Sequence, residues 1–389
     1  MRISLARVLV AVLVLAVACT DDSGDGTTTT TEAVRPLDRE LRLNDIQVLG
    51  THNSYHLQGE APVFDALHAF DAALAEGLEY SHAQLDEQLD EQGIRQLEID
   101  VYGDPDGGRY ATPAGASFVG IDAPADSALL EPGFKVFHIQ DIDYRSTCPT
   151  LMACLTIVRD WSVAHPGHVP MFVMIEVKDS AIPDPGLGFV VPPPTTPADF
   201  DALDAEIRSV FDADHLITPD DVRGEHDSLE EAVLTDGWPT LADSRGKLLF
   251  GLVNSGPLLD LYVEGHAALA GRVLFTTSAA GTPEAAFMRI EESIENEARI
   301  RQAVLDGYIV RARTDVDTAQ ARTGDTTMRD AALRSGAQFI STDYPVDDPR
   351  FAPEFVVAIP DGTPARCNPV RAPAGCTSTD IEDPALLSE

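Results

Sequence analysis

Eight short apolar runs constrain the fold of this chain more than any other feature of its sequence. Each run holds four to eight residues and is almost continuously hydrophobic, which is typical of parallel strands that are covered on both faces. The runs are residues 46–50 (IQVLG), 94–101 (IRQLEIDV), 134–138 (FKVFH), 171–177 (MFVMIEV), 247–253 (KLLFGLV), 272–276 (RVLFT), 308–311 (YIVR) and 338–342 (QFIST).

Helical patterns lie between several of these runs. Apolar residues recur at helical spacing in Leu151–Ala164, and we also expect helices at Glu284–Leu305 and Thr326–Ser335. Eight alternations of strand and helix predict an α/β fold, a TIM-type (β/α)8 barrel. The chain has 389 residues, of which 44% are hydrophobic, and such barrels commonly form one domain of about 250 residues or more. We therefore expect a single barrel domain over residues 37–376.

The amino-terminal residues have the form of an export signal. Arg2 and Arg7 precede an apolar run, Val8–Ala18, that is too short to span a bilayer. The small residues at its end lead directly into Cys19, as at a bacterial lipoprotein cleavage site. We expect a signal peptide at 1–18 and a lipid anchor on Cys19, which would hold the exported protein at the membrane surface. The alternative is an ordinary signal peptide cleaved near Ala18, which would release the protein.

Two polar segments flank the predicted barrel. Residues 19–36 include five consecutive threonines and read as a flexible linker behind the anchor. Residues 377–389 are acidic with few large apolar groups, and we expect a loose tail there.

Four further cysteines fall into two close pairs, Cys148 with Cys154 and Cys367 with Cys376. An oxidising compartment would allow both pairs to form disulfides. Zinc binding is the alternative, but neither spacing is C-x-x-C and no histidine lies close to either pair. Two local disulfides are the better prediction.

The charge balance excludes some partners. The chain carries 27 basic and 64 acidic residues, a formal net charge of -37. Nucleic acids need clustered lysines and arginines, so we expect no nucleic-acid partner. Electrostatic docking on a strongly anionic membrane is disfavoured for the same reason. An acidic surface does tolerate cations such as calcium. We expect a monomer.

Polar residues that can carry chemistry stand at the ends of the first four apolar runs. In a barrel of this type the active site lies at the carboxyl ends of the strands, so these residues should meet. They are His52 and Asn53 after the first run, Glu98 and Asp100 in the second, His138 with Asp141 after the third, and Glu176 and Lys178 at the fourth.

The carboxylates among them indicate a cation. Glu98 and Asp100 are two residues apart, so in a strand both project from one face. Inside an apolar run they would repel each other unless a cation neutralised them, and Glu176 follows the same logic. With the amide oxygen of Asn53 they form an all-oxygen ligand set. Such a set suits a hard cation, calcium before magnesium, and does not suit zinc.

His52 and His138 complete the predicted site. Two imidazoles beside a metal ion are suited to phosphodiester cleavage, because one group can take a proton, another can give one, and cations hold the phosphoryl charge. Either histidine alone is more commonly a structural residue. Tyr55 and His56, which follow in the same stretch, are assigned to the rim with no role.

In this order the motifs resemble those of the calcium-dependent phosphoinositide-specific phospholipases C, most nearly their exported bacterial branch. The resemblance rests on the segments GTHNSYH, EIDV, VFHIQDID and STDYP, and it covers the chain from about Leu43 to Pro345. These motifs are specific together and weak singly. The separate lipid-binding and calcium-binding modules of the eukaryotic members are not recognisable here.

The resemblance implies a role for each residue. His52 would stabilise the pentacoordinate phosphorane, and His138 would protonate the departing diacylglycerol oxygen. Calcium held by Asn53, Glu98, Asp100 and Glu176 would activate the inositol 2-hydroxyl, with Glu98 or Glu176 as the base. Lys178 would contact a substrate oxygen or a ring phosphate. The products would be diacylglycerol and an inositol phosphate, formed through a 1,2-cyclic intermediate.

Two alternatives are weighed against this interpretation. Glycerophosphodiester phosphodiesterases use a similar barrel, but their first histidine is typically followed by Arg-Gly, whereas here Asn53 and Ser54 follow. A non-catalytic surface lipoprotein would have no use for paired carboxylates inside an apolar strand. The proline-rich segment 182–198 fits either a functional lid or a passive insertion.

Overall fold

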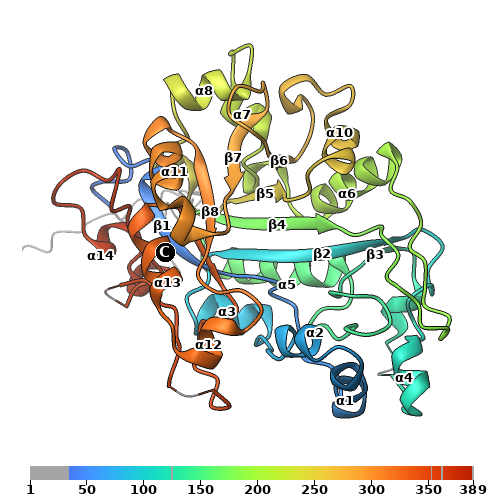
Figure 1. The fold of residues 1–389 in the computed structure, drawn as a ribbon. Coiled ribbons are helices and arrows are strands. Elements are labelled where there is room, and N and C mark those ends of the chain that lie inside the picture. Colours follow the sequence, from blue (N-terminus) through green and yellow to red (C-terminus); the bar gives the residue numbers. More distant parts are fainter. Residues whose placement is uncertain (1–34, 124–125, 352, 361, 388–389) are drawn as a thin grey trace, which may run out of the picture. The chain divides into compact units, whose positions relative to one another are not determined.

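The fold is a closed barrel of eight parallel strands surrounded by helices, as expected (Figure 1). The computed structural model describes residues 35–123, 126–351, 353–360 and 362–387. β1 pairs with β9 on one side and with β2 on the other, so the sheet closes on itself. In sheet order the barrel strands are β1 (Ile46–Thr51), β2 (Gln96–Asp104), β4 (Met171–Val177), β5 (Leu248–Leu252), β6 (Leu274–Thr277), β7 (Ala285–Arg289), β8 (Ile309–Arg313) and β9 (Phe339–Thr342).

Two of the predicted elements are wrong. Of the third apolar run, 134–138, only Phe134 and Lys135 form a strand, in β3 (Gly133–Lys135), which pairs antiparallel with the end of β2 outside the barrel. The eighth barrel strand is β7, which lies inside the stretch expected to be helical. Its alanines and methionine favour a helix by propensity, but burial between β6 and β8 outweighs that preference. The helix itself, α11, is shorter than expected and runs from Ser293 to Asp306.

Helices fill most connections, although none follows β6. The predicted helix at Leu151–Ala164 is confirmed as α5, and the one near Thr326–Ser335 as α13 (Thr327–Ser335). The other α-helices are α1 (Ala61–Phe70), α2 (Ala72–Gly77), α3 (Leu85–Asp90), α4 (Ala114–Val119), α6 (Pro197–Val210), α7 (Pro219–Arg223), α8 (Leu229–Thr235), α9 (Leu241–Ser244), α10 (Pro257–Val263), α12 (Ala319–Thr323) and α14 (Ser378–Ile381).

Large side chains fill the barrel interior at the level of the strand starts. The ring of Phe172 stacks on Phe339 at 4.7 Å and meets Phe287 edge-on at 4.9 Å. On β1, a Cβ at Gly50 would lie 2.0 Å from the side-chain oxygen of Gln96. Only glycine therefore lets β1 approach β2 closely enough to close the barrel.

Both predicted disulfides are present. Cys148–Cys154 joins the segment before α5 to that helix, and Cys367–Cys376 closes a loop behind β10 (Ala365–Cys367). β10 pairs antiparallel with the first half of β1, on the edge opposite to β9.

The acidic segment expected to be a loose tail is anchored to the barrel near its middle. Ile381 and Glu382 are fully buried. The carboxylate of Glu382 accepts hydrogen bonds from the guanidinium of Arg95, just before β2, and from the backbone of Val169. The sequence suggested a loose tail because its composition is polar, but a buried charge that is paired in this way anchors the segment.

None of the described helices is both long and apolar enough to cross a membrane. The predicted signal peptide and the lipid anchor at Cys19 lie outside the described residues.

Candidate active site

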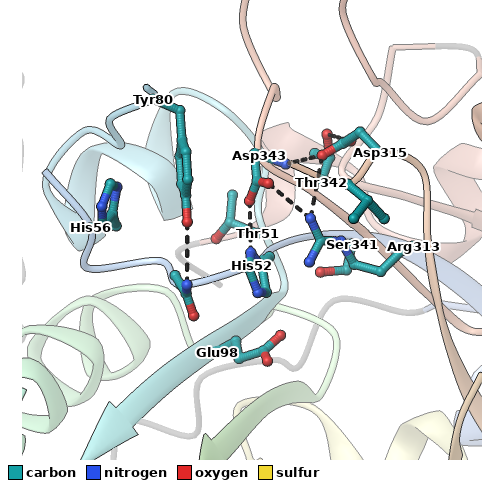
Figure 2. A network of polar contacts seen from close by, with 12 residues as sticks. Thr51, His52, His56, Tyr80, Glu98, Arg313, Asp315, Ser341, Thr342 and Asp343 are labelled. Carbon is teal, nitrogen blue, oxygen red and sulfur yellow. Dashed lines mark hydrogen bonds and ion pairs between the residues drawn. The ribbon is translucent and has the colours of Figure 1, made fainter. Parts of the chain in front are cut away.

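His52 stands at the carboxyl end of β1 and is held by a carboxylate beyond the neighbouring strand β9 (Figure 2). Its Nδ1 lies 2.9 Å from Oδ1 of Asp343, whose other oxygen accepts a hydrogen bond of 2.8 Å from Arg313. The backbone N–H of Asp343 donates to Asp315. Because a carboxylate only accepts, Nδ1 of His52 carries the proton, and Nε2 is left for a substrate.

Several effects lower the pKa of His52 well below its usual value. Burial contributes most, followed by the positive charges of Arg313, Arg311 and His138. The side chain of His52 keeps 23% of its surface exposed, which leaves room for contact with a ligand.

Asn53 and Ser54 follow the end of β1, and hydrogen bonds of Ser54 tie this turn to β2. Asn53 has a left-handed backbone (φ 44°) and is buried, and its amide Nδ2 donates to the hydroxyl of Tyr80 at 3.2 Å. That bond fixes the amide so that Oδ1 remains available. Ser54 donates its backbone N–H to the carbonyl of Glu98 and accepts from the N–H of Glu98 at 2.9 Å. This reciprocal pair sets the height of Asn53 relative to the carboxylates of β2.

The three predicted carboxylates lie on adjacent strands. Glu98 and Asp100 on β2 are buried, and Glu176 on β4 is half-buried directly beside Asp100 in the sheet register. Lys178 Nζ lies 3.2 Å from Asp100 and 3.0 Å from Glu176, and Arg311 donates a 2.6 Å hydrogen bond to Glu98. Burial raises the pKa of Glu98 to about 7 against the opposing charge of Arg311.

A hard cation fits this cluster. Among the described residues, the buried carboxylate of Asp100 meets only Lys178, at Oδ2, while its Oδ1 has no partner, which is costly unless a further cation approaches it. The available donors are all oxygens, as calcium prefers. Among the described residues, a compact group of three possible metal ligands forms elsewhere, at His56, His138 and Asp143. The carboxylates of the predicted calcium site stand further apart than the ligands of that group, around Lys178. A bound ion would therefore share these carboxylates with the ammonium group of Lys178.

Two arginines that the sequence reasoning missed lie beside these carboxylates. Arg311 and Arg313 are two residues apart on β8, project from one face and are almost completely buried. Arg311 also pairs with Glu291 at 2.7 Å. The sequence signal for these arginines was a pair of charged residues at alternate positions within a buried run. The same signal was recognised for Glu98 and Asp100. Despite the acidic composition, this corner of the barrel therefore offers fixed positive charge.

His138 lies in the loop after β3 rather than on a barrel strand, and it shares a carboxylate with His56. Nδ1 of His138 and Nε2 of His56 each lie 2.9 Å from Oδ2 of Asp143. The ring of His56 is fully buried and stacks on Tyr80 at 4.3 Å. Its assignment to the rim is therefore wrong, as is that of Tyr55, which is also fully buried. His56 positions Asp143, and Asp143 in turn orients His138.

This carboxylate favours the protonated form of His138. Burial opposes that form, but the hydrogen bond and charge of Asp143 outweigh it and raise the pKa of His138. Burial would likewise raise the pKa of Asp143, yet the charge of His56 and the hydrogen bonds from both rings hold it well below its usual range. The ring of His138 keeps 21% exposure and presents Nε2 as a proton donor.

We expect Asp143→Asn to move the pH dependence of the enzyme. A raised pKa keeps His138 protonated below that pKa, so an activity that needs its proton is lost as pH rises through it. The amide removes the raising interactions while burial remains, so the pKa falls and the alkaline limb of kcat/KM shifts to lower pH. At pH 7 we expect about a hundredfold loss of kcat. Asp343→Asn serves as the matched control, and an unshifted alkaline limb in Asp143→Asn would refute the role of Asp143.

The structure thus brings together most of the residues that the sequence singled out: His52, Asn53, Glu98, Asp100, His138, Glu176 and Lys178. Asp141 turns away from them and accepts backbone hydrogen bonds from Ala114 and Val190. The missed residues are Asp143, Asp343 and the two arginines. Both aspartates stand in the quoted segments VFHIQDID and STDYP, but nothing in a single sequence shows which carboxylate faces which ring.

Solved structures share this barrel. A calcium-dependent phosphoinositol-specific phospholipase C from Pseudomonas sp. matches at 19% identity with a TM-score of 0.51, over 85% of this chain and 97% of its own. The myoinositol complex from the same source has a TM-score of 0.50 at the same identity and coverage. A calcium-dependent phosphatidylinositol-specific enzyme from Streptomyces antibioticus is 21% identical over 78% of this chain and 95% of its own, with a TM-score of 0.47.

Sequence comparison defines the family. No curated protein matches the chain. A family model described as phosphoinositide phospholipase C, Ca²⁺-dependent, matches residues 41–369, which include every proposed site residue of the barrel. The chain therefore belongs to the calcium-dependent phosphoinositide phospholipase C family and is a phosphodiesterase of that type.

Proposed function

We propose that the protein cleaves phosphatidylinositol-type phosphodiesters to diacylglycerol and a cyclic inositol phosphate by two-histidine acid–base catalysis. The observation that carries this proposal is the pair of imidazoles, each held by its own carboxylate: His52 by Asp343, and His138 by Asp143. Each pair fixes one ring nitrogen and leaves the other for the phosphodiester.

The two histidine–carboxylate pairs have different roles in the proposed reaction. The inositol 2-hydroxyl forms a bond to phosphorus and passes its proton to Glu98 or Glu176. The bond from phosphorus to the diacylglycerol oxygen breaks, and that oxygen takes the proton of His138. His52 contacts the phosphoryl group through Nε2 and stabilises the pentacoordinate phosphorane. A bound phosphate anion raises the pKa of His52 and so offsets the arginines that lower it.

Asn53, Glu98, Asp100 and Glu176 would hold Ca²⁺, and the main support for that assignment is the buried Oδ1 of Asp100, which has no partner in the described part of the chain. When bound, the ion supplies positive charge next to the attacking hydroxyl and the phosphate. Lys178 and Arg311 balance the carboxylates and lie where an anionic substrate oxygen can contact them. This placement of cations also explains how so acidic a chain accepts an anionic lipid.

The test is an assay of the purified protein on phosphatidylinositol and on glycerophosphoinositol, with phosphorus NMR to identify the products. We expect faster cleavage of phosphatidylinositol and a 1,2-cyclic phosphate as the first product. Faster cleavage of the deacylated substrate, with a glycerol phosphate product, would instead assign the chain a glycerophosphodiesterase activity.

We also propose that the protein acts outside the cytoplasm as a lipid-anchored monomer. The sequence around Cys19 and the two disulfides support export. Mass spectrometry of the mature amino-terminal peptide decides the anchor: a diacylated Cys19 supports it, and an unmodified end near Ala18 contradicts it.

A further inference from the structure

An apolar groove of about 880 Å³ opens beside the loop after β3 that carries His138 and Asp143, here called the catalytic loop. α1 and α4, which pack against each other, form one part of its wall, and the proline-rich segment Ile182–Phe189 forms another (Figure 1). These elements follow the carboxyl ends of β1, β2 and β4, so the groove lies on the same face of the barrel as the two histidines.

The lining of the groove carries much less charge than the rest of this acidic chain. Its lining contains a single charged residue, Asp71, although the sequence carries 64 acidic residues. The carboxylate of Asp71 is engaged in capping α2. Large apolar side chains stand exposed at the groove, Phe70 at 78% and Phe118 at 62%. Exposed apolar surface of this kind indicates contact with an apolar ligand.

The groove borders the catalytic loop through two of the residues that line it. Ile139, which follows His138 directly, and Ile142, which precedes Asp143, both line it. The group that leaves with the proton of His138 is therefore released next to apolar side chains.

Asp141 holds the groove in a formed state. Its carboxylate accepts hydrogen bonds from the backbone of Ala114 at 2.8 Å and of Val190 at 2.6 Å. Its carbonyl accepts from Gly115, where a Cβ would lie only 2.3 Å from that oxygen. One residue of the catalytic loop thus fixes both α4 and the proline-rich segment, and the cavity needs no rearrangement before it binds.

We propose that this groove binds an acyl chain of the diacylglycerol leaving group and so selects acylated substrates. The proposal rests on the proposed function, since it assigns the groove to the product that His138 releases. The volume lies within the range of ligand pockets, and the proline-rich segment becomes a wall of the substrate site rather than a passive insertion.

The test uses soluble substrates, so that membrane binding plays no part. Wild-type enzyme is assayed on glycerophosphoinositol and on dibutanoyl and dihexanoyl phosphatidylinositol below their micelle concentrations. Each methylene that enters the groove should raise kcat/KM about fourfold. Ala66→Trp, on the wall formed by α1, should lower kcat/KM for the dihexanoyl substrate at least about tenfold and leave glycerophosphoinositol within about twofold.

Ala61→Trp is the matched control, because Ala61 is exposed on the same helix and does not line the groove. Leu187→Asp gives a second variant on the opposite wall in case Ala66→Trp does not fold. Equal chain-length dependence in wild type and Ala66→Trp would overturn the proposal. So would a defect confined to phosphatidylinositol in vesicles, which would make this face a surface for membrane insertion. A wild-type enzyme that cleaves none of the substrates would instead refute the proposed function.

Discussion

Replacement of His138 by alanine should lower kcat on phosphatidylinositol about a thousandfold and leave the fold intact, because loss of a general acid costs about a hundred- to ten-thousandfold. The ring is one-fifth exposed, and among the described residues it hydrogen-bonds only to Asp143. Its removal should therefore cost little stability. A substrate whose leaving group needs no proton, such as a nitrophenyl ester of inositol phosphate, should lose much less activity in this variant.

His52→Ala should be comparably inactive, but without that recovery, because His52 is assigned to the phosphoryl group rather than to the leaving oxygen. His226→Ala is a suitable control, since His226 pairs with Asp236 on the surface. Circular dichroism and thermal melting should show the wild-type fold in all three variants. Near-normal turnover in either active-site variant, or equal recovery of both on the activated substrate, would contradict the assigned roles.

Removal of calcium should abolish cleavage of phosphatidylinositol, and readdition of calcium should restore it. The expectation follows from the buried carboxylates of β2 and from Oδ1 of Asp100, which has no partner among the residues that the structure describes and would gain one in a bound cation. Asp100→Asn keeps the shape of the side chain and removes one ligand charge, so we expect the Kd for Ca²⁺ to rise about a hundredfold.

Isothermal titration calorimetry of calcium into wild type and Asp100→Asn measures that change without reference to activity. Asp184→Asn is the control, since Asp184 is an acidic residue in the proline-rich segment and lies outside the ligand set. Activity that chelator leaves unchanged, or equal calcium affinity in wild type and Asp100→Asn, would refute the assigned ligands.

The sequence predicted the barrel well because seven of its eight strands are near-continuous apolar runs. It failed at β7, whose residues Ala285–Arg289 have helical propensity and are strand only because a gap between β6 and β8 must be filled. Such tertiary requirements are not visible in a local window. The run 134–138 failed in the opposite way, since apolar residues there pack outside the barrel.

The arrangement of the candidate site was predictable where its residues lie within a strand, as Glu98 does, or directly after one, as His52 and Asn53 do. It was not predictable where a loop decides the geometry. His56 is only four residues from His52, yet it faces Asp143 on another segment. Arg311 and Arg313 could have been found, because buried charges two residues apart on a strand need partners wherever they occur.

The order in which the barrel can close follows from the neighbours of its first strand. β1 pairs with β9 and β10, and His52 meets Asp343 across 291 residues of sequence. Arg95, just before β2, pairs with Glu382, which lies 287 residues later in the sequence. Contacts this distant form slowly, because the chain loses much conformational entropy before they stabilise it. The strand that carries the first histidine is therefore among the last to be secured, so the site around His52 is complete only after the carboxyl-terminal strands have been made.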